Sequence, residues 1–454
     1  MSDTLLKADL PTQRLETAIP DLKPALSRDQ AVAEANRCLY CYDAPCVVAC
    51  PTDINIPQFI KRIADDNVRG AAHTILESNI LGHSCARVCP VEVLCAGSCV
   101  YTEKGEPPIM IGKLQRYATE YAYDRDIQFF QAGPPTGKRI ALVGGGPASL
   151  AAAHELRKAG HETVIFEGRS MPGGLNTTGV APYKYHAEDA LKEVEYVRAI
   201  GVEIRTNTLV GRDVTFDQLA SEFDAVFLGV GLGPDSRLGI PGEDLPGCVG
   251  AVDWIERMKT EAGFTIAHVK KAIVIGGGNT AIDAARELKH LGVEAVTMVY
   301  RRGETEMSGY AHELAWARQE GVAICYWAAP AAVEGQTHVT GLRCARTEVG
   351  DDGKLHVLNE EFVLEADLVV RATGQEKLTA LLGGIPGLVV ERGRLVVNAE
   401  TGQTGNAKYF AGGDCANGGK EVVNAAAEGK RAARGIDSFL RHAGSPSEIS
   451  VTIK

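Results

Sequence analysis

Eight of the twelve cysteines lie in one N-terminal stretch, at spacings that metal centres use. Four occur in CLYCYDAPCVVACP (38–51) and four in CARVCPVEVLCAGSC (85–99). The N-terminus has no basic segment followed by an apolar core, so we expect a cytoplasmic protein with reduced thiols. Thiols gathered in this way are then expected to bind metal rather than to form disulfides.

The spacing of the first set favours iron–sulfur clusters over zinc. It follows C-x2-C-x4-C-x3-C-P, close to the bacterial ferredoxin run whose fourth cysteine ligates the other cluster. The x4 spacing departs from the ferredoxin x2, so an ordinary ferredoxin domain is not expected. Zinc would need two C-x-x-C pairs or mixed Cys and His ligands, and only Cys38 and Cys41 form such a pair. Eight thiols could hold two clusters with four ligands each.

A glycine-rich turn joins an apolar strand to a helix in KRIALVGGGPASLAAAHELRKAGHETVIFE (138–167). It has the first two glycines of G-x-G-x-x-G and a serine at the third, so the backbone can approach a pyrophosphate at the helix N-terminus. An acid closes the next strand, where it can bind ribose hydroxyls. The alternative is a tight turn without a ligand. The candidate residues are Gly144, Gly145, Gly146, Pro147, Ala148, Ser149 and Glu167.

The same pattern recurs in KKAIVIGGGNTAIDAARELKHLGVEAVTMVYRR (270–302), with alanine at the third small position. Its second strand ends in two arginines rather than an acid. Arginines there can hold the 2′-phosphate of NADP, and the alternative is a solvated basic strand end. The candidate residues are Gly276, Gly277, Gly278, Asn279, Thr280, Arg301 and Arg302.

Two dinucleotide turns in one chain indicate one FAD and one NAD(P)H. YFAGGDCA (409–416) resembles the second flavin motif of two-dinucleotide flavoproteins, with Asp414 near the ribityl or phosphate region. DAVFLGVGL (224–232) and ADLVVRATGQ (366–375) resemble the chain crossings between the two domains of such proteins. This order implies that the nicotinamide domain is inserted into the FAD domain.

The N-terminal region has helical patterns around the cysteines. Ser27 can cap a helix that runs toward Cys38, and Pro57 stands near the start of another helical stretch. QAGPPTGKR (131–139) indicates a linker. We therefore predict an α/β two-dinucleotide-binding (Rossmann-like) flavoprotein with an all-α iron–sulfur domain. Its predicted domains are helical 1–133, FAD-binding 134–247 with 375–454, and NAD(P)H-binding 248–374.

The cysteine runs followed by GGGPAS, GGGNTA and AGGD resemble a known electron-transfer module over nearly the whole chain. They are similar to the flavin/iron–sulfur half of dihydropyrimidine dehydrogenase and to the small subunit of glutamate synthase. That resemblance implies two [4Fe–4S] clusters with interleaved ligands. One would use Cys38, Cys41, Cys46 and Cys99, and the other Cys50, Cys89, Cys95 and Gln115. Cys85 would then be a spare buried thiol; alternatively Cys85 ligates iron and Gln115 lies on a helix surface.

The resemblance also carries cofactor positions onto this sequence. In the FAD site it adds Gly174, Leu175, Lys184 and the Gly413–Asp414 turn, with Lys184 where the eukaryotic enzyme has Arg. In the nicotinamide site it adds Ala372, Thr373 and Gly374. This sequence has Ser308 at the position of one further Arg of the NADPH-dependent relative, so the resemblance does not decide between NADPH and NADH.

The resemblance implies hydride transfer from NAD(P)H to FAD, which needs no catalytic side chain, followed by single-electron transfer through two [4Fe–4S] clusters. Gln115 and GGLNTTGVAPYK (173–184) favour the bacterial pyrimidine branch. We then expect an FMN-containing catalytic subunit as partner, which reduces uracil and thymine to 5,6-dihydropyrimidines, in a heterotetramer of two plus two. The alternatives are the small subunit of NADPH-dependent glutamate synthase and a stand-alone flavin NAD(P)H reductase.

The charge and hydropathy of the chain disfavour other partners. The net charge of −11 makes a nucleic-acid partner unexpected. No run of about 18 uncharged apolar residues occurs, so no membrane span is expected.

Overall fold

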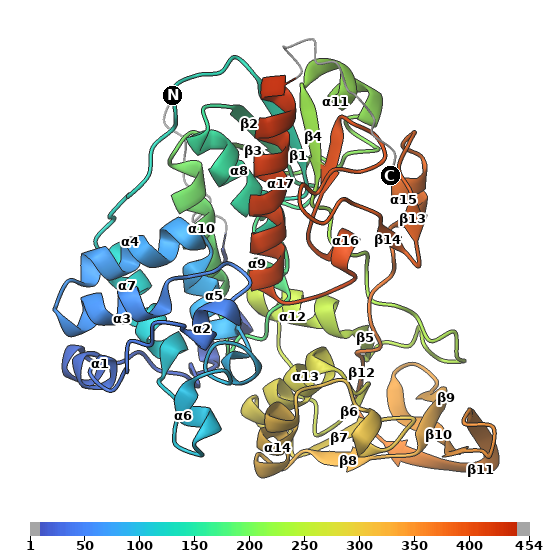
Figure 1. Cartoon of the computed structure of the whole chain (residues 1–454). Coiled ribbons are helices and arrows are strands. Elements are labelled where there is room, and N and C mark those ends of the chain that lie inside the picture. Colours follow the sequence, from blue (N-terminus) through green and yellow to red (C-terminus); the bar gives the residue numbers. More distant parts are fainter. Residues whose placement is uncertain (1–9, 443–454) are drawn as a thin grey trace.

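The computed structural model describes residues 10–442 of the 454 (Figure 1). The ends of the predicted domains, 1–9 and 443–454, lie outside the described residues. Residues 10–123 form helices without strands, as predicted. These are η2 Leu15–Ala18, α1 Arg28–Ala35, α2 Pro45–Val48, α3 Ile56–Ala64, α4 Val68–Ser78, α5 Gly82–Val88, η3 Val91–Val93, α6 Val100–Glu103 and α7 Ile111–Tyr123.

Local signals set the ends of these helices. Ser27 caps α1 in a reciprocal capping box with Gln30, as the sequence indicated. The apolar stretch after Pro57 forms two helices, α3 and α4, because the chain turns at Asp66, whose φ is +58°. Four thiols, those of Cys50, Cys85, Cys89 and Cys99, are buried in the core that these helices share.

The first sheet is parallel, with strand order β15-β4-β1-β2-β3. Along β1, Ile140 and Leu142 enter one apolar core, while Ala141 and Val143 enter the core on the opposite face. This alternation buries both faces, as parallel sheets require. The strands are β1 Arg139–Val143, β2 Glu162–Phe166, β3 Glu203–Arg205, β4 Ala225–Leu228 and β15 Tyr409–Ala411; the helices are α8 Pro147–Lys158, α9 Leu175–Thr178, α10 Ala187–Arg198, α11 Phe216–Glu222, α16 Asp414–Asn417 and α17 Val422–His442.

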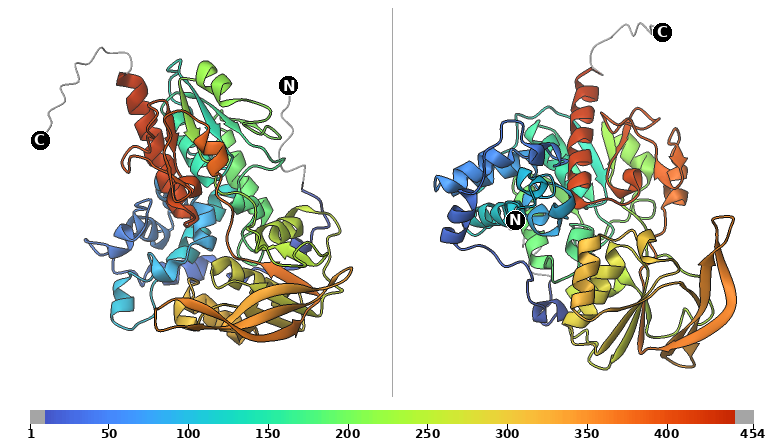
Figure 2. Two further views of the ribbon diagram at one scale, coloured as in Figure 1. Left: turned by 90° about the vertical axis from the view of Figure 1, so that its right-hand side faces the viewer. Right: turned by 60° about the horizontal axis from the view of Figure 1, so that its bottom comes forward.

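The second sheet is also parallel, with order β5-β12-β6-β7-β8. An antiparallel sheet, β11-β10-β9, packs beside it (Figure 2). The parallel strands are β5 Cys248–Gly250, β6 Lys271–Ile275, β7 Ala295–Val299, β8 Ala323–Cys325 and β12 Leu368–Arg371, with helices α12 Ala251–Thr260, α13 Asn279–His290, η4 Glu304–Glu306 and α14 Ala311–Gln319. The antiparallel strands are β9 Ala328–Gly335, β10 Val339–Val349 and β11 Leu355–Glu365; α15 Thr379–Gly383, β13 Val390–Glu391 and β14 Arg394–Leu395 complete the chain.

Strand β15 comes from the end of the chain, yet it pairs with β4 in the first sheet. Two connections pass between the sheets side by side. The amide of Gly233 donates to the Glu376 carbonyl over 2.9 Å, and the amide of Ser236 donates to the Gly374 carbonyl over 2.9 Å. Two parallel dinucleotide-type sheets and a helical N-terminal region confirm the predicted fold class.

An N-terminal strap formed by residues 10–22 joins the helical region to both sheet regions. The carboxylate of Glu16 is fully buried and accepts from the Ala187 amide over 2.7 Å, with Lys259 Nζ at 3.7 Å. The Gln13 carbonyl accepts from the Gly263 amide over 2.9 Å. Within residues 10–442, no helix is long and apolar enough to cross a membrane.

Candidate cofactor-binding sites

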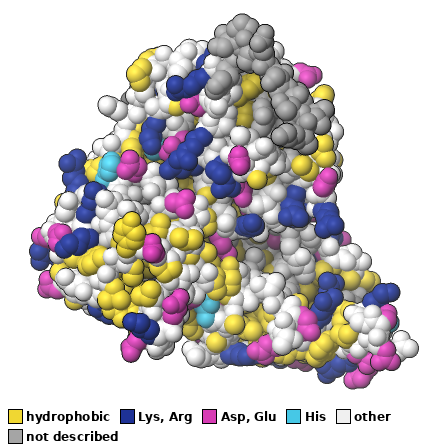
Figure 3. All heavy atoms as spheres, in the orientation of Figure 1, with side chains coloured by type: hydrophobic (Ala, Val, Ile, Leu, Met, Phe, Trp, Pro, Cys, Tyr) yellow, Lys and Arg dark blue, Asp and Glu magenta, His cyan; other side chains and the backbone are white. Residues whose placement is uncertain are grey.

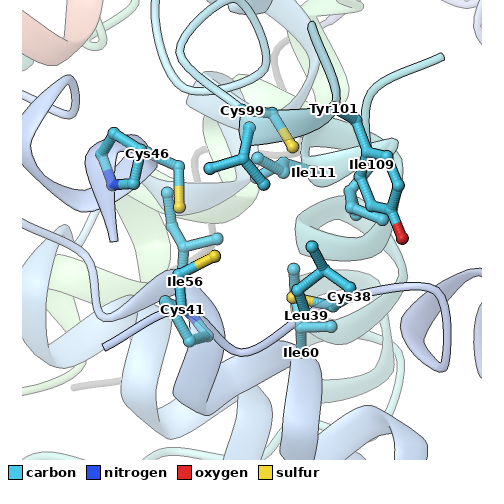
Figure 4. A pocket seen from close by; sticks show the side chains of 13 residues that line it. Cys38, Leu39, Cys41, Cys46, Ile56, Ile60, Cys99, Tyr101, Ile109 and Ile111 are labelled. Atoms are coloured by element: carbon cyan, nitrogen blue, oxygen red, sulfur yellow. The ribbon is translucent and has the colours of Figure 1, made fainter. Parts of the chain in front are cut away.

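Four cysteine side chains surround a cavity near the surface of the helical region, here called the outer thiol cavity. The sulfur atoms of Cys38, Cys41, Cys46 and Cys99 face one another across a common space (Figure 4). Cys38 and Cys41 lie in the loop before α2, Cys46 lies in α2 itself, and Cys99 immediately precedes α6. The other walls are mainly apolar and include Ile56, Ile60, Ile109 and Ile111. This set matches the first predicted ligand group.

A second cavity, the inner thiol cavity, lies toward the first sheet. Its lining includes Cys50, Cys89, Cys95 and Gln115, the second predicted ligand group. Val423 at the start of α17 completes one wall. A residue of the last helix therefore contacts a site built by the helical region, and no sequence motif marks Val423 for that position.

Both Cys85 and Gln115 line the inner cavity. Gln115 is 6% exposed, so the alternative that places it on a helix surface is wrong. Its Nε2 donates to the Gly82 carbonyl over 2.6 Å, which leaves Oε1 as the amide atom able to ligate metal. Cys85 is also buried, and its Sγ accepts from Asn79 Nδ2 over 3.1 Å. Both the Cys85 thiol and Gln115 Oε1 therefore lie at the inner cavity as candidates for the eighth ligand.

The spacing of the donor atoms separates a cluster from a single ion. Across residues 10–442, no three His, Cys, Asp or Glu side chains converge closely enough to bind one metal ion. Zinc draws thiolates to about 2.3 Å, whereas each thiol cavity holds four or more donors around a wider space. Sulfur donors with apolar walls fit iron–sulfur clusters.

The first glycine turn has the geometry of a pyrophosphate site. Gly144 has φ +90°, and a Cβ atom there would lie 2.5 Å from the Gly229 carbonyl oxygen, so only glycine fits. Glu167 Oε2 accepts from the Gly145 amide over 2.7 Å, which fixes the acid beside the turn. Helix α8 then begins at Pro147, with its free N–H groups facing the turn.

Four other predicted flavin residues gather at this turn: Gly174, Leu175, Gly413 and Asp414. A Cβ atom on Gly413 would lie 3.1 Å from Cβ of Ala148, and one on Gly174 would lie 2.8 Å from the Gly146 Cα. The structure thus brings together three separate segments, 144–149, 174–175 and 413–414. Asp414 begins α16, and burial raises its pKa. Ser149 is buried behind the turn, against Gly229.

The second glycine turn connects β6 to α13. Gly276 has φ +145° and closely approaches the Ala372 carbonyl, which places Thr373 and Gly374 beside the turn. Asn279 Oδ1 accepts from the Tyr310 amide over 2.9 Å, and Thr280 is exposed in the first turn of α13. Arg301 and Arg302 are exposed just after β7, so their guanidinium groups are available to a ligand.

Lys184 has partners that no sequence motif predicts. Its Nζ pairs with Asp283 on α13 at 2.7 Å and with Glu313 on α14 at 2.8 Å. Burial opposes the charge, but these two acids keep the pKa of Lys184 raised. Both acids belong to the second sheet region, so Lys184 forms an ion-pair cluster between the two sheet regions.

Sequence reasoning also missed Tyr310, which connects three segments. Its amide contacts Asn279 in the second glycine turn, and its hydroxyl donates to Glu421 Oε1 over 2.8 Å. Glu421 immediately precedes α17. A tyrosine in a loop gives no signal for such a contact, because its partner lies 111 residues away.

Two sheets with glycine turns and two thiol cavities define a two-dinucleotide flavoprotein reductase with an iron–sulfur domain. Residues 15–127 match the family described as dihydropyrimidine dehydrogenase domain II, 4Fe-4S cluster. Residues 138–429 match the pyridine nucleotide-disulphide oxidoreductase family. The chain therefore belongs to the pyridine nucleotide-disulphide oxidoreductases and carries this iron–sulfur domain at its N-terminus. Its cofactors are FAD, [4Fe–4S] clusters and NAD(P)H.

Two relatives from Escherichia coli K12 are about equally similar. The NAD-dependent dihydropyrimidine dehydrogenase subunit PreT is 36% identical over 430 residues, covering 94% of this chain and 98% of that protein. The glutamate synthase [NADPH] small chain is 35% identical over 436 residues, covering 91% and 92%. Among solved structures, Mycobacterium tuberculosis FprA in complex with NADPH has a TM-score of 0.55 at 23% identity, covering 69% of this chain and 85% of that one. These relatives establish an NAD(P)H-dependent flavin and iron–sulfur electron-transfer protein.

Proposed function

We propose that the chain is the electron-input subunit of a cytoplasmic dihydropyrimidine dehydrogenase. It takes electrons from NAD(P)H and passes them to an FMN-containing partner subunit, which reduces uracil and thymine to 5,6-dihydropyrimidines. The observation that carries this proposal is the buried Gln115 in the inner thiol cavity, since this residue distinguishes the pyrimidine branch in the resemblance. We further propose two copies of each subunit in the assembly.

The residues of the chain fit this role without a catalytic acid or base. When bound, FAD accepts a hydride and releases single electrons, which iron–sulfur clusters can carry. The chain positions the dinucleotides through its two glycine turns, Glu167 and Asp414. Buried Ile and Cys side chains keep the thiol cavities largely apolar.

The two thiol cavities are ordered from the flavin region toward the surface. The inner cavity has Val423 of α17 in its wall. Three thiols of the outer cavity, those of Cys38, Cys41 and Cys46, are only partly buried. This order suits electrons that enter beside the first sheet and leave at the helical region.

Exposed apolar side chains around the outer cavity support a partner at this exit, and we call them the outer apolar face. Tyr42 is 99% exposed and Val48 is 83% exposed. A single exposed apolar side chain is common on protein surfaces and does not by itself indicate a binding site. Leu39, which lines the outer cavity, is 52% exposed, and in the same helical region Val93 and Met110 are 53% and 40% exposed. Figure 3 shows apolar side chains gathered over this region. Such a patch favours a protein contact.

A coupled assay tests the proposal. The purified chain, with its iron and flavin counted, is mixed with NADH or NADPH and uracil, with and without the FMN-containing subunit. We expect uracil-dependent oxidation only with that subunit. Activity with glutamine and 2-oxoglutarate plus a glutamate synthase large subunit, without a uracil response, would assign the chain to the other branch. Equal NAD(P)H oxidation with and without either partner would favour a stand-alone reductase.

A further inference from the structure

A buried carboxylate of the flavin region binds the start of a helix in the iron–sulfur region. Glu193 on α10 is 1% exposed and belongs to no dinucleotide motif. Its Oε1 accepts from the backbone amides of His83 and Ser84, at 3.0 and 2.9 Å. Its Oε2 accepts from the hydroxyls of Ser84 and Tyr185, the latter at 3.2 Å. Glu193 therefore uses both oxygens to hold the first turn of α5.

The same serine is bound from the flavin side by a second residue. Asn176 Nδ2 donates to Ser84 Oγ over 2.8 Å. Asn176 lies in α9, directly after the Gly174–Leu175 segment that meets the first glycine turn. One hydrogen-bonded chain therefore runs from the predicted flavin loop through Ser84 to Glu193.

On its other side, α5 belongs to the inner thiol cavity. The helix contains Cys85 and is followed directly by Cys89, and both cysteines line that cavity. The carbonyl of Gly82, the first residue of α5, accepts from Gln115 Nε2 over 2.6 Å. The first turn of α5 is therefore bonded on both sides. The Ser84 side chain binds Asn176 of the flavin loop, and the Gly82 carbonyl binds Gln115 of the inner cavity.

We propose that Glu193 and Asn176 are positioning residues that hold α5 against the flavin loop and thereby set the alignment of the flavin with the inner thiol cavity. A carboxylate that accepts four hydrogen bonds in a buried site has a fixed position, because loss of any partner leaves a buried polar group unsatisfied. The inference rests on the electron-transfer part of the proposed function and holds for either partner enzyme.

The variants Glu193→Gln and Asn176→Ala test this role. We expect both to retain FAD and iron and to reduce flavin at the normal rate in a stopped-flow experiment with NAD(P)H. Reduction of the clusters, followed by freeze-quench electron paramagnetic resonance, should slow by about tenfold or more, because small misplacements are costly. The resonance signal and midpoint potential of one cluster should also shift. Glu195→Gln is the matched control, since Glu195 pairs with Arg198 on the same helix.

The outcomes separate this inference from the proposed function. Unchanged cluster signals, potentials and reduction rates in both variants would overturn the positioning role. If Glu193→Gln loses FAD or iron, Asn176→Ala decides alone, because it removes a single hydrogen bond to Ser84. Loss of the uracil response in the wild-type chain, together with altered cluster signals in the variants, would refute the pyrimidine assignment and leave the positioning role intact.

Discussion

Val423 and Cys50 line the same cavity, although they lie near opposite ends of the chain. Val423 lies in the first turn of α17, which packs along α8 behind the first glycine turn (Figure 1). Gly429 of α17 approaches the Ala148 carbonyl so closely that no side chain fits there. One helix therefore touches the predicted flavin site and closes the inner thiol cavity, and the two sites form one packed unit.

Measuring the iron content of two variants can identify the eighth cluster ligand. Gln115→Ala should lose one cluster, because Oε1 of Gln115 has no substitute in alanine. The iron content should fall from about eight to about four per chain. If Gln115 is the ligand, Cys85→Ser should keep both clusters, because Cys85 is then a spare buried thiol hydrogen-bonded to Asn79. The reverse pattern, with loss of iron only in Cys85→Ser, would make Cys85 the ligand.

We expect Glu167 to be needed for tight FAD binding. It accepts from the amides of Gly145 and Arg169 and would also bind ribose hydroxyls. Glu167→Ala should weaken FAD binding by about tenfold or more, because these donors lose a charged acceptor. Flavin fluorescence after dialysis measures the loss. Glu162→Ala, at the exposed start of the same strand, is the control, and an equal effect there would contradict the assignment.

Arg301 and Arg302 should decide between the two nicotinamides. If they bind a 2′-phosphate, Arg301→Ala with Arg302→Ala should lower kcat/KM for NADPH by about tenfold or more. The value for NADH should change little, since NADH lacks that group. Steady-state dye reduction with each nucleotide gives the ratio, and Arg212→Ala on the surface of the first sheet region is the control. An unchanged NADPH-to-NADH ratio would mean that the arginines are a solvated strand end.

The outer apolar face should respond to added charge. Val48→Glu places a carboxylate in the proposed contact, and its desolvation should weaken partner binding by about tenfold. Val357→Glu on β11 is a matched control, because Val357 is 63% exposed and belongs to the distant antiparallel sheet. Titration of each variant with the FMN-containing subunit measures the effect. Equal affinities for the two variants would move the docking site elsewhere.

A buried acid at the junction with the strap should make stability depend on pH. Burial, with a smaller contribution from nearby Asp283, raises the pKa of Glu287 from 4.5 to about 8. Between pH 4.5 and about 8, Glu287 stays protonated in the native chain but is ionised in the unfolded chain. Its contribution to the free energy of unfolding is therefore complete below pH 4.5 and is lost as the pH rises toward about 8.

Urea unfolding midpoints at about pH 5 and about pH 8 test this dependence. The wild type should lose more stability than Glu287→Gln over this interval, whereas Glu294→Gln, whose side chain is 70% exposed, should behave as the wild type. Burial lowers the pKa of Lys259 to about 8, so this neighbour acts mainly above the tested interval. Parallel pH profiles for the wild type and Glu287→Gln would show that Glu287 does not titrate in this range.

The sequence by itself determined the parts of this protein whose chemistry is local. A G-x-G turn between a strand and a helix needs small residues at fixed spacings, so Gly144 and Gly276 could be recognised from the local sequence alone. The cysteine spacings identified the iron–sulfur region for the same reason, and family resemblance supplied the interleaving of Cys99 with Cys38.

Only the tertiary structure decided which distant residues meet. Glu193 with Ser84, Lys184 with Asp283, and Val423 with the inner thiol cavity all join segments from different regions. In each case an ordinary residue acquires its role from burial and from partners that a different element supplies. Such contacts follow from how helices and sheets pack, and packing depends on shape and volume across the whole core rather than on local spacing.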